Sequence, residues 1–283
     1  MKPAMSPIWA RLSPVMLSRA LMISALLALG IGEARAIEVD SEIVILVDNN
    51  FPGVTNQDFD TMMEGYAAAL SSSQVLDSIA SGERGRIAVS MTFYGTTPGE
   101  TVGIPWMSIG SAADAQAAAD AIRSITRPRQ GTVSLEDGIR NATANFGSET
   151  GNAGNGFESL VQVIEVAATT RPRSPADQLA ASIASSDALA AGVDSLSTMT
   201  LGRHADTIAA YYESNVVGGT MTGGGEVTVG GDSAAWSAQF SQYLGGQVGS
   251  AADMANAAVP EPSVPMMLMF SFGAWALFVR RRA

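Results

Sequence analysis

The sequence predicts an α/β fold, a doubly wound and mostly parallel sheet with helices on both faces. Two observations carry this prediction. Strand-like segments alternate with helix-like segments along the chain, which is typical of parallel sheets built from strand–helix–strand units. Two of the strand-like segments, EIVILVD at 42–48 and LVQVIEVAA at 160–168, are also predominantly apolar, without the alternation of apolar and polar residues that a half-exposed strand shows. Such runs are expected of strands that are buried on both faces.

The first part of the chain shows the alternation most clearly. The strand at 42–48 ends at Asp48, and a turn with the sequence FPGVTNQ follows it. Apolar residues then recur at helical spacing from Phe59 to Leu70. The further expected elements are a strand at 86–95, an edge strand at 101–109 that contains Pro105, and helices at 111–125 and 134–146.

The second part continues the pattern after the apolar strand at 160–168. The expected elements are a helix at 176–191, a weaker strand at 193–201, a helix at 205–216, a short strand at 226–229 and a final amphipathic helix at 234–248. Two glycine-rich segments, 147–159 and 218–226, are expected to be flexible turns. A phosphate-binding loop is disfavoured there because no GxxxxGK[ST] pattern and no lysine are present.

The composition of the body, residues 37–259, limits the functions open to it. The body holds nine arginines, no lysine and 25 acidic residues, a formal net charge of −16. So acidic a body repels nucleic acid and anionic lipid headgroups, so that no nucleic-acid partner is expected. The absence of cysteine excludes disulfides and thiolate zinc sites, and a single histidine, His204, excludes a site with several histidine ligands.

The first 36 residues predict a secretory signal peptide. Lys2, Arg11 and Arg19 precede a short apolar core at 21–31, and Ala34 and Ala36 form an A-x-A cleavage site. Signal peptidase is therefore an expected partner, and the mature chain is expected to begin at Ile37. The alternative is a retained anchor helix, which the short apolar core disfavours.

The C-terminal 24 residues, 260–283, have three parts in order. These are Pro260, Glu261 and Pro262, a 16-residue apolar run at 264–279, and Arg280, Arg281 and Arg282. As a helix the run reaches about 24 Å, which is short of the ~30 Å hydrocarbon core, and the arginines are expected to remain on the cytoplasmic side. A small polar linker is expected at 250–259. A plain tail anchor is the alternative.

This tail resembles the PEP-CTERM sorting signal. The resemblance implies a transient inner-membrane precursor in a Gram-negative exporter that commonly makes exopolysaccharide. It also implies cleavage near the Pro-Glu-Pro triplet by an exosortase, and release of the body to the cell surface or extracellular matrix.

The body resembles a von Willebrand factor type A-like domain, and more closely a bacterial family of such domains without an assigned activity. The resemblance covers nearly all of 37–249. It rests on five features that follow one another in this order along the chain. The first is Asp48 after the first strand, and the others are EGYAAAL at 64–70, GRIAVSMTFYG at 85–95, VSLEDGI at 133–139 and YYESNVVGG at 211–219.

The resemblance implies a magnesium site of the kind called a metal-ion-dependent adhesion site, and this sequence lacks several of its ligands. Asp48 matches the first ligand, and Asn50 and Pro52 stand at the two serine positions. Val133 stands at the threonine position beside Thr132, and Thr169 stands where an aspartate is typical. Two interpretations stay open. Asp48, Asn50 and Thr132 form a reduced metal site, or Asp48 instead caps its own turn and no cofactor binds.

Other candidate residues point to no defined reaction. No G-x-S-x-G elbow accompanies His204, and Glu136 and Asp137 are adjacent, so they point in different directions on a helix. Trp106 and Trp236 fit core packing better than sugar stacking. Four arginines in loops are candidates for a small basic patch that meets an acidic polysaccharide, although solvated loop arginines are the favoured interpretation: Arg127, Arg129, Arg171 and Arg173.

The main hypothesis is therefore a non-enzymatic surface or matrix protein that binds a matrix polysaccharide or another surface protein, or that has a structural role. A metal-dependent adhesin and a polysaccharide-active hydrolase are the alternatives.

Overall fold

The computed structural model describes residues 36–50, 55–201, 204–219, 227–228, 242, 245–246 and 248–253. The expected signal peptide apart from Ala36, the sorting signal at 260–283, Pro52 and Trp236 lie outside these residues. Within the described part of the chain, no helix has the length and apolar character needed to cross a membrane.

The central sheet has the order β4-β3-β2-β6-β7-β8, and β9 also pairs with β7. β2 pairs in parallel with β3 and β6, and β6 with β7, whereas β4 and β8 are antiparallel to their neighbours. The bounds are β2 Ser41–Asp48, β3 Ile87–Tyr94, β4 Val102–Ile109, β6 Gln162–Ala168, β7 Ser195–Thr200, β8 Gly218–Gly219 and β9 Val227–Thr228. The predicted doubly wound, mostly parallel sheet is confirmed, with the strand containing Pro105 at its edge.

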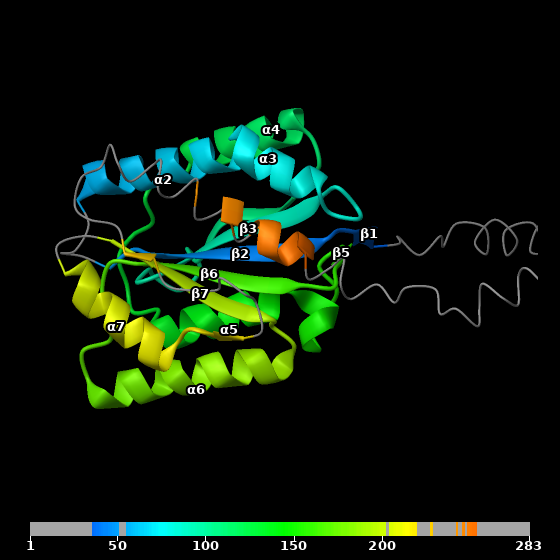
Figure 1. Ribbon diagram of the computed structural model, residues 1–283. Coiled ribbons are helices and arrows are strands. Elements are labelled where there is room, and N and C mark those ends of the chain that lie inside the picture. The colour runs from blue at the N-terminus through cyan, green and yellow to red at the C-terminus, as the bar shows by residue number, and fades with distance from the viewer. Residues whose placement is uncertain are drawn as a thin grey trace, which may run out of the picture. The chain divides into compact units, whose positions relative to one another are not determined.

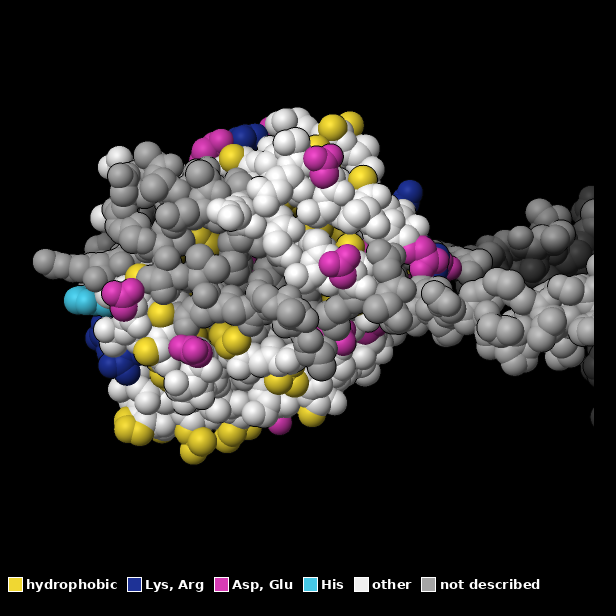
Figure 2. Space-filling model, in the orientation of Figure 1, with side chains coloured by type: hydrophobic (Ala, Val, Ile, Leu, Met, Phe, Trp, Pro, Cys, Tyr) yellow, Lys and Arg dark blue, Asp and Glu magenta, His cyan; other side chains and the backbone are white. Residues whose placement is uncertain are grey.

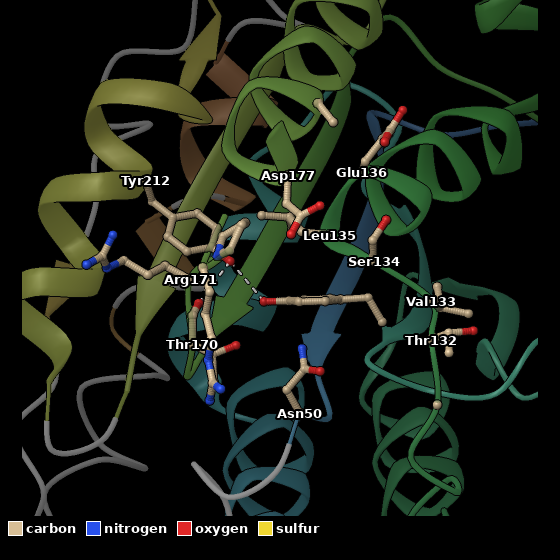
Figure 3. Close-up of a pocket in the computed structure, with 15 residues that line it drawn as sticks. Asn50, Thr132, Val133, Ser134, Leu135, Glu136, Thr170, Arg171, Asp177 and Tyr212 are labelled. Carbon is tan, nitrogen blue, oxygen red and sulfur yellow. Dashed lines mark hydrogen bonds between the residues drawn. The ribbon is translucent and has the colours of Figure 1, made fainter. Parts of the chain in front are cut away.

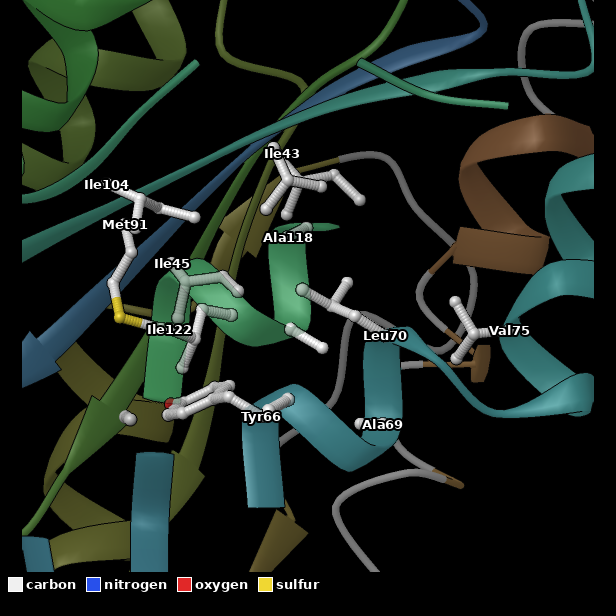
Figure 4. Packing of buried hydrophobic residues seen from close by; sticks show 14 of the residues in the cluster. Ile43, Ile45, Tyr66, Ala69, Leu70, Val75, Met91, Ile104, Ala118 and Ile122 are labelled. Atoms are coloured by element: carbon white, nitrogen blue, oxygen red, sulfur yellow. The ribbon is translucent and has the colours of Figure 1, made fainter. Parts of the chain in front are cut away.

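Helices cover both faces of this sheet (Figure 1). One face carries α2 (Asn56–Leu70), α3 (Ser73–Ala80) and α4 (Ala112–Arg123). The other carries α5 (Leu135–Asn145), α6 (Pro175–Ala191) and α7 (Ala205–Asn215). Two core clusters result, because alternate residues of the buried β2 point to opposite faces. Ile43 and Ile45 pack under α2 and α4 (Figure 4), whereas Val44 and Leu46 pack on the α5 side.

Three short segments differ from the sequence-based expectation. Helix α3 was not predicted. The glycine-rich segment 147–159 is not a flexible turn throughout, because it contains a 3-10 turn, η2 (Gly147–Thr150), and a short strand, β5 (Phe157–Glu158), that pairs with β1 (Ile37–Glu38). Residues 248–253 are helical, and Val248 and Ala251 join the core, so the segment expected to be a linker from 250 begins inside a helix.

Trp106 is partly buried and packs against two of the core clusters, so packing is favoured over sugar stacking, as predicted. Its ring packs against Phe146 and Phe157, with ring centroids 5.8 and 6.2 Å away. Its indole Nε1 donates a hydrogen bond to the carbonyl of Asn145 at 2.9 Å. The ring therefore joins β4 to α5 and to the small β1–β5 sheet, and both its polar and apolar parts are in use.

Candidate functional site

A pocket of about 410 Å³ opens at the carboxyl edge of the parallel sheet (Figure 3). It lies where β2 and β6 end, and the chain crosses from β2 to β3 in one direction and from β6 to β7 in the other. This position is the topological switch point, where doubly wound sheets bind their ligands. The pocket is lined by Asn50, Tyr94, 131–136, 170–173, Asp177, Ala180 and Tyr212.

Asp48 lies at the base of this region and is completely buried. Its Oδ2 accepts hydrogen bonds from the backbone N–H groups of Thr169 and Thr170 at 3.1 and 2.8 Å, and from their hydroxyls at 2.9 and 2.7 Å. Its Oδ1 accepts from the backbone N–H and the Nδ2 of Asn50, both at 2.8 Å. The carboxylate therefore caps its own turn, as one interpretation expected, and also joins the ends of β2 and β6.

Asn50 faces the pocket, and its position depends on a glycine across the sheet edge. Gly95 has φ of +73°, and a Cβ at this position would lie only 2.7 Å from Cγ of Asn50 and 2.8 Å from its backbone nitrogen. A larger residue would therefore both strain the turn after β3 and displace Asn50. The glycine lets the two loops approach closely enough for Asn50 to reach Asp48.

The other residues implied for the metal site do not gather around Asp48. Thr132 lines the pocket and is exposed, but it is not among the hydrogen-bond partners of Asp48. Val133 is buried in the α5-side core. Thr169 contributes donors to Asp48 through its N–H and hydroxyl. Among the described residues, no group of three or more His, Cys, Asp or Glu side chains is placed to hold a metal ion.

Two buried tyrosines form one wall of the pocket. The Tyr212 hydroxyl donates to the carbonyl of Thr170 at 3.3 Å and lies 2.9 Å from the Tyr94 hydroxyl (Figure 3). Burial, followed by the negative charge of Asp48, raises the pKa of both tyrosines well above the ordinary value. Both phenols therefore stay protonated at neutral pH and act as structural donors rather than as bases.

The four candidate arginines have different environments. Arg127 donates from Nε to Asn49 at 2.9 Å and from Nη1 to Asn56 at 3.2 Å, and it lies over the ring of Phe59. Arg129 forms an ion pair with Glu100 at 2.6 Å. These two arginines hold loops together. They therefore do not form one patch with the remaining pair.

Arg171 and Arg173 line the pocket and are exposed. Within the part of the chain that the structure describes, no carboxylate lies within ion-pair distance of either guanidinium. Glu136 and Asp177 also line the pocket, in the first turns of α5 and α6. Glu136 is paired with Arg140 at 3.2 Å. The opening thus combines two guanidinium groups, neither ion-paired with a described carboxylate, with hydrogen-bond acceptors.

Sequence reasoning found Asp48 and Asn50 but missed the role of Tyr94 and Thr170. The sequence did contain a signal for Tyr94, because this residue is the last of β3, as Asp48 is the last of β2. The two residues are paired where the parallel strands β2 and β3 end. Thr170 carried no comparable signal, since its contact with Asp48 spans 122 positions. His204 is the N-cap residue of α7 and is not among the residues that line the pocket.

Several solved structures are similar to this chain. Proximal thread matrix protein 1 from the mussel byssus has 12% identity and a TM-score of 0.47 over 74% of this chain and 48% of its own. The pilus adhesin SpaC from Lactobacillus rhamnosus GG has 14% identity and a TM-score of 0.44 over 77% of this chain and 31% of its own. A variant of the PilB minor pilin from Streptococcus sanguinis has 10% identity and a TM-score of 0.47 over 78% of this chain and 64% of its own. The chain thus spans about half the length of the mussel protein.

The comparison of sequences gives one assignment. No curated protein matches the chain. A family model described as "Protein of unknown function (DUF1194)" matches residues 38–223, which include every strand from β2 to β8 and every residue that lines the pocket. Since this match covers more than half of the chain, the protein belongs to the DUF1194 family.

Proposed function

We propose that the protein is an exported, non-enzymatic binding protein of the cell surface or extracellular matrix, and that its pocket at the sheet edge works without a metal ion. The observation that carries this proposal is the set of donors around Asp48. Backbone N–H groups, hydroxyls and an amide N–H₂ already occupy both carboxylate oxygens.

These residues do not fit Mg²⁺. The ion requires about six oxygen ligands in octahedral geometry, with carboxylates supplying most of the charge. The backbone N–H groups of Asn50, Thr169 and Thr170 all point at Asp48, and they cannot be turned into acceptors without a change in both loops. A cation at Asp48 would therefore meet donors. We treat the site as a degenerate form of the metal site that the sequence resemblance implies.

The same geometry supports binding rather than catalysis. A general base must have a free lone pair within reach of substrate, and Asp48 is buried with both oxygens engaged. The two tyrosine hydroxyls are protonated and bonded to each other. The exposed polar groups at the pocket opening suit recognition of a ligand by hydrogen bonds and charge.

Export and sorting form the second part of the proposal. The signal peptide with Ala34 and Ala36 and the tail with Pro260, Glu261 and Pro262 support it from the sequence. Signal peptidase and an exosortase would process the two ends, with the precursor held briefly in the inner membrane. The body would then act outside the cell.

Divalent metals are expected to leave the thermal stability of the protein unchanged. The measurement is a thermal melt in EDTA and in millimolar Mg²⁺ or Mn²⁺. A metal present at 100 times its dissociation constant adds about 2.7 kcal/mol to the free energy of unfolding, which is readily seen as a higher midpoint. A metal-induced rise in the midpoint that Thr132→Val abolishes would establish the metal-dependent adhesin in place of this proposal.

The tail is expected to be removed when the protein is produced in a host that contains an exosortase. Cell fractionation and mass spectrometry of the C-terminus would detect a shortened species outside the inner membrane, and deletion of the exosortase would retain the precursor. A mature protein that keeps residues 264–279, stays in the inner membrane and ignores loss of the exosortase would contradict the sorting proposal.

A further inference from the structure

We propose that the pocket recognises a carboxylate-bearing sugar unit of an acidic polysaccharide, a uronate, with Arg171 and Arg173 as the carboxylate-binding residues. This inference rests on the proposed function, since it names the ligand of the same pocket. Its first support is that, among the residues that the structure describes, no carboxylate lies within ion-pair distance of Arg171 or Arg173. The other upper-loop arginines, Arg127 and Arg129, already bind Asn49, Asn56 and Glu100.

The sequence between the two arginines favours a shared target. Pro172 separates Arg171 from Arg173, and all three residues line the pocket. Proline fixes its own φ near −65° and favours extended backbone in the residue before it, which limits the backbone conformations that carry the two side chains. A guanidinium binds a carboxylate through two parallel N–H donors, and this match gives direction as well as charge. Arg171 lies beside Thr170 and Tyr212 (Figure 3).

The remaining polar residues favour a sugar over an acidic peptide. Glu136 and Asp177 are exposed or half-buried at the opening, and their carboxylates are acceptors that suit the hydroxyl donors of a saccharide. In the described residues, Asp177 contributes only its backbone N–H to the cap of α6, so its carboxylate is free. A peptide of Asp and Glu side chains carries a negative charge on each unit, as a uronate chain does, but it has no hydroxyl donors for these two carboxylates and offers only its backbone N–H groups.

The net charge of the body does not prevent such binding. Acidic side chains are spread over the face in Figure 2 rather than gathered at one place. Repulsion between exposed charges is largely screened beyond about 8 Å at physiological ionic strength, whereas direct contacts with the two guanidinium groups act at much shorter range. The volume of about 410 Å³ admits one or two sugar units, so recognition of a short segment is expected.

The experiment is a calorimetric titration of the protein with a tetrasaccharide of galacturonic acid, and with its methyl-esterified form as the uncharged match. We expect saturable binding of the acid and at least about tenfold weaker binding of the ester, since the ester removes the charge that Arg171 and Arg173 recognise. The variant Arg171→Gln/Arg173→Gln should lose a similar factor. Arg84→Gln is the matched control, because this exposed arginine pairs with Glu38 and Glu83 far from the pocket lining.

Asp177→Asn separates the two kinds of acidic ligand by the sign of its effect. The variant should bind the tetrasaccharide more weakly, because a charged acceptor for its hydroxyl groups is lost. It should bind a poly-glutamate peptide more tightly, because a repulsive charge is removed. Tighter binding of the peptide than of the sugar, or equal loss in Arg84→Gln and in the double variant, would overturn the uronate assignment. The thermal melt distinguishes this failure from failure of the proposed function. If divalent metals leave the melting midpoint unchanged, only the uronate assignment is overturned. If a metal raises the midpoint and Thr132→Val abolishes the rise, the metal-free binding function is overturned as well.

Discussion

Replacement of Asp48 by alanine is expected to lower the free energy of unfolding by about 3–5 kcal/mol, whether or not Mg²⁺ is present. The reason is that the substitution removes the acceptor for six hydrogen bonds, and the buried donors of Thr169 and the partly buried donors of Thr170 lose their partner. A hydrogen bond to a charged group contributes about 1.5–3 kcal/mol, and an unsatisfied buried donor costs about 1–3 kcal/mol. Urea unfolding in EDTA and in Mg²⁺ gives the measurement.

Two threonine variants test whether the hydrogen bonds to Asp48 are the cause of the loss of stability. Thr170→Val removes one hydroxyl donor but keeps the backbone N–H bond to Asp48, so a loss of about 1 kcal/mol is expected. Thr132→Val changes an exposed threonine of the same pocket and should stay within about 0.5 kcal/mol. An Asp48→Ala protein with nearly unchanged stability in EDTA would show that Asp48 does not hold the two strand ends together.

Stability is expected to fall as the pH rises from about 4.5 to about 7, because of Glu42. This residue is completely buried at the amino end of β2, where it accepts hydrogen bonds from Asn155 and from the hydroxyl of Ser159. Burial, assisted by the nearby charge of Glu149, raises the pKa of Glu42 from 4.5 to about 7. The folded protein therefore holds a proton in this pH range that the unfolded chain releases.

The sign follows from that difference in proton binding. The contribution of Glu42 is fully present below pH 4.5 and is lost as the pH passes through about 7. A shift of this size corresponds to at most about 3 kcal/mol. Glu42→Gln should abolish this loss and make the protein more stable than the wild type at pH 8, because a neutral amide replaces a buried charge.

Urea unfolding of both proteins across this pH range isolates the effect, since their other titrating groups are the same. Glu149→Gln should lower the pKa of Glu42 only in part, because burial is the larger cause of the raised pKa. Stability should then fall with pH over a narrower range than in the wild type. A constant difference in stability between Glu42→Gln and the wild type at every pH would contradict the assignment to Glu42.

The elements of the sheet could be predicted from the sequence because their signals are local. The run 42–48 is apolar at every position between Glu42 and Asp48, and β2 is buried at all of its positions. Helix α3 was missed because its eight residues include two serines and an aspartate, and it depends on the burial of Val75 and Ile79. The short strand β5 exists only through its pairing with β1, which a local pattern does not reveal.

The candidate site was predictable only in part, for the same reason. Asp48 and Asn50 lie two positions apart, so their hydrogen bonds follow from a short turn. The contribution of Thr169 and Thr170 needs β2 beside β6, which is a property of the whole sheet. The separate environments of the four arginines likewise depend on partners far away in sequence, such as Asn49 for Arg127.

The position of β2 between β3 and β6 also affects how the protein folds. During synthesis β2 emerges first, but its second neighbour, β6, begins 121 positions after the start of β2, and Asp48 meets Thr169 across the same interval. The chain between β2 and β6 loses conformational entropy when its ends come together, before contacts between the two strands offset that loss. Parallel pairing of distant strands is slow for this reason. Until β6 arrives, one edge of the apolar β2 stays open to pairing with other chains. Folding speed, and not only final stability, therefore depends on the same central strand that carries Asp48.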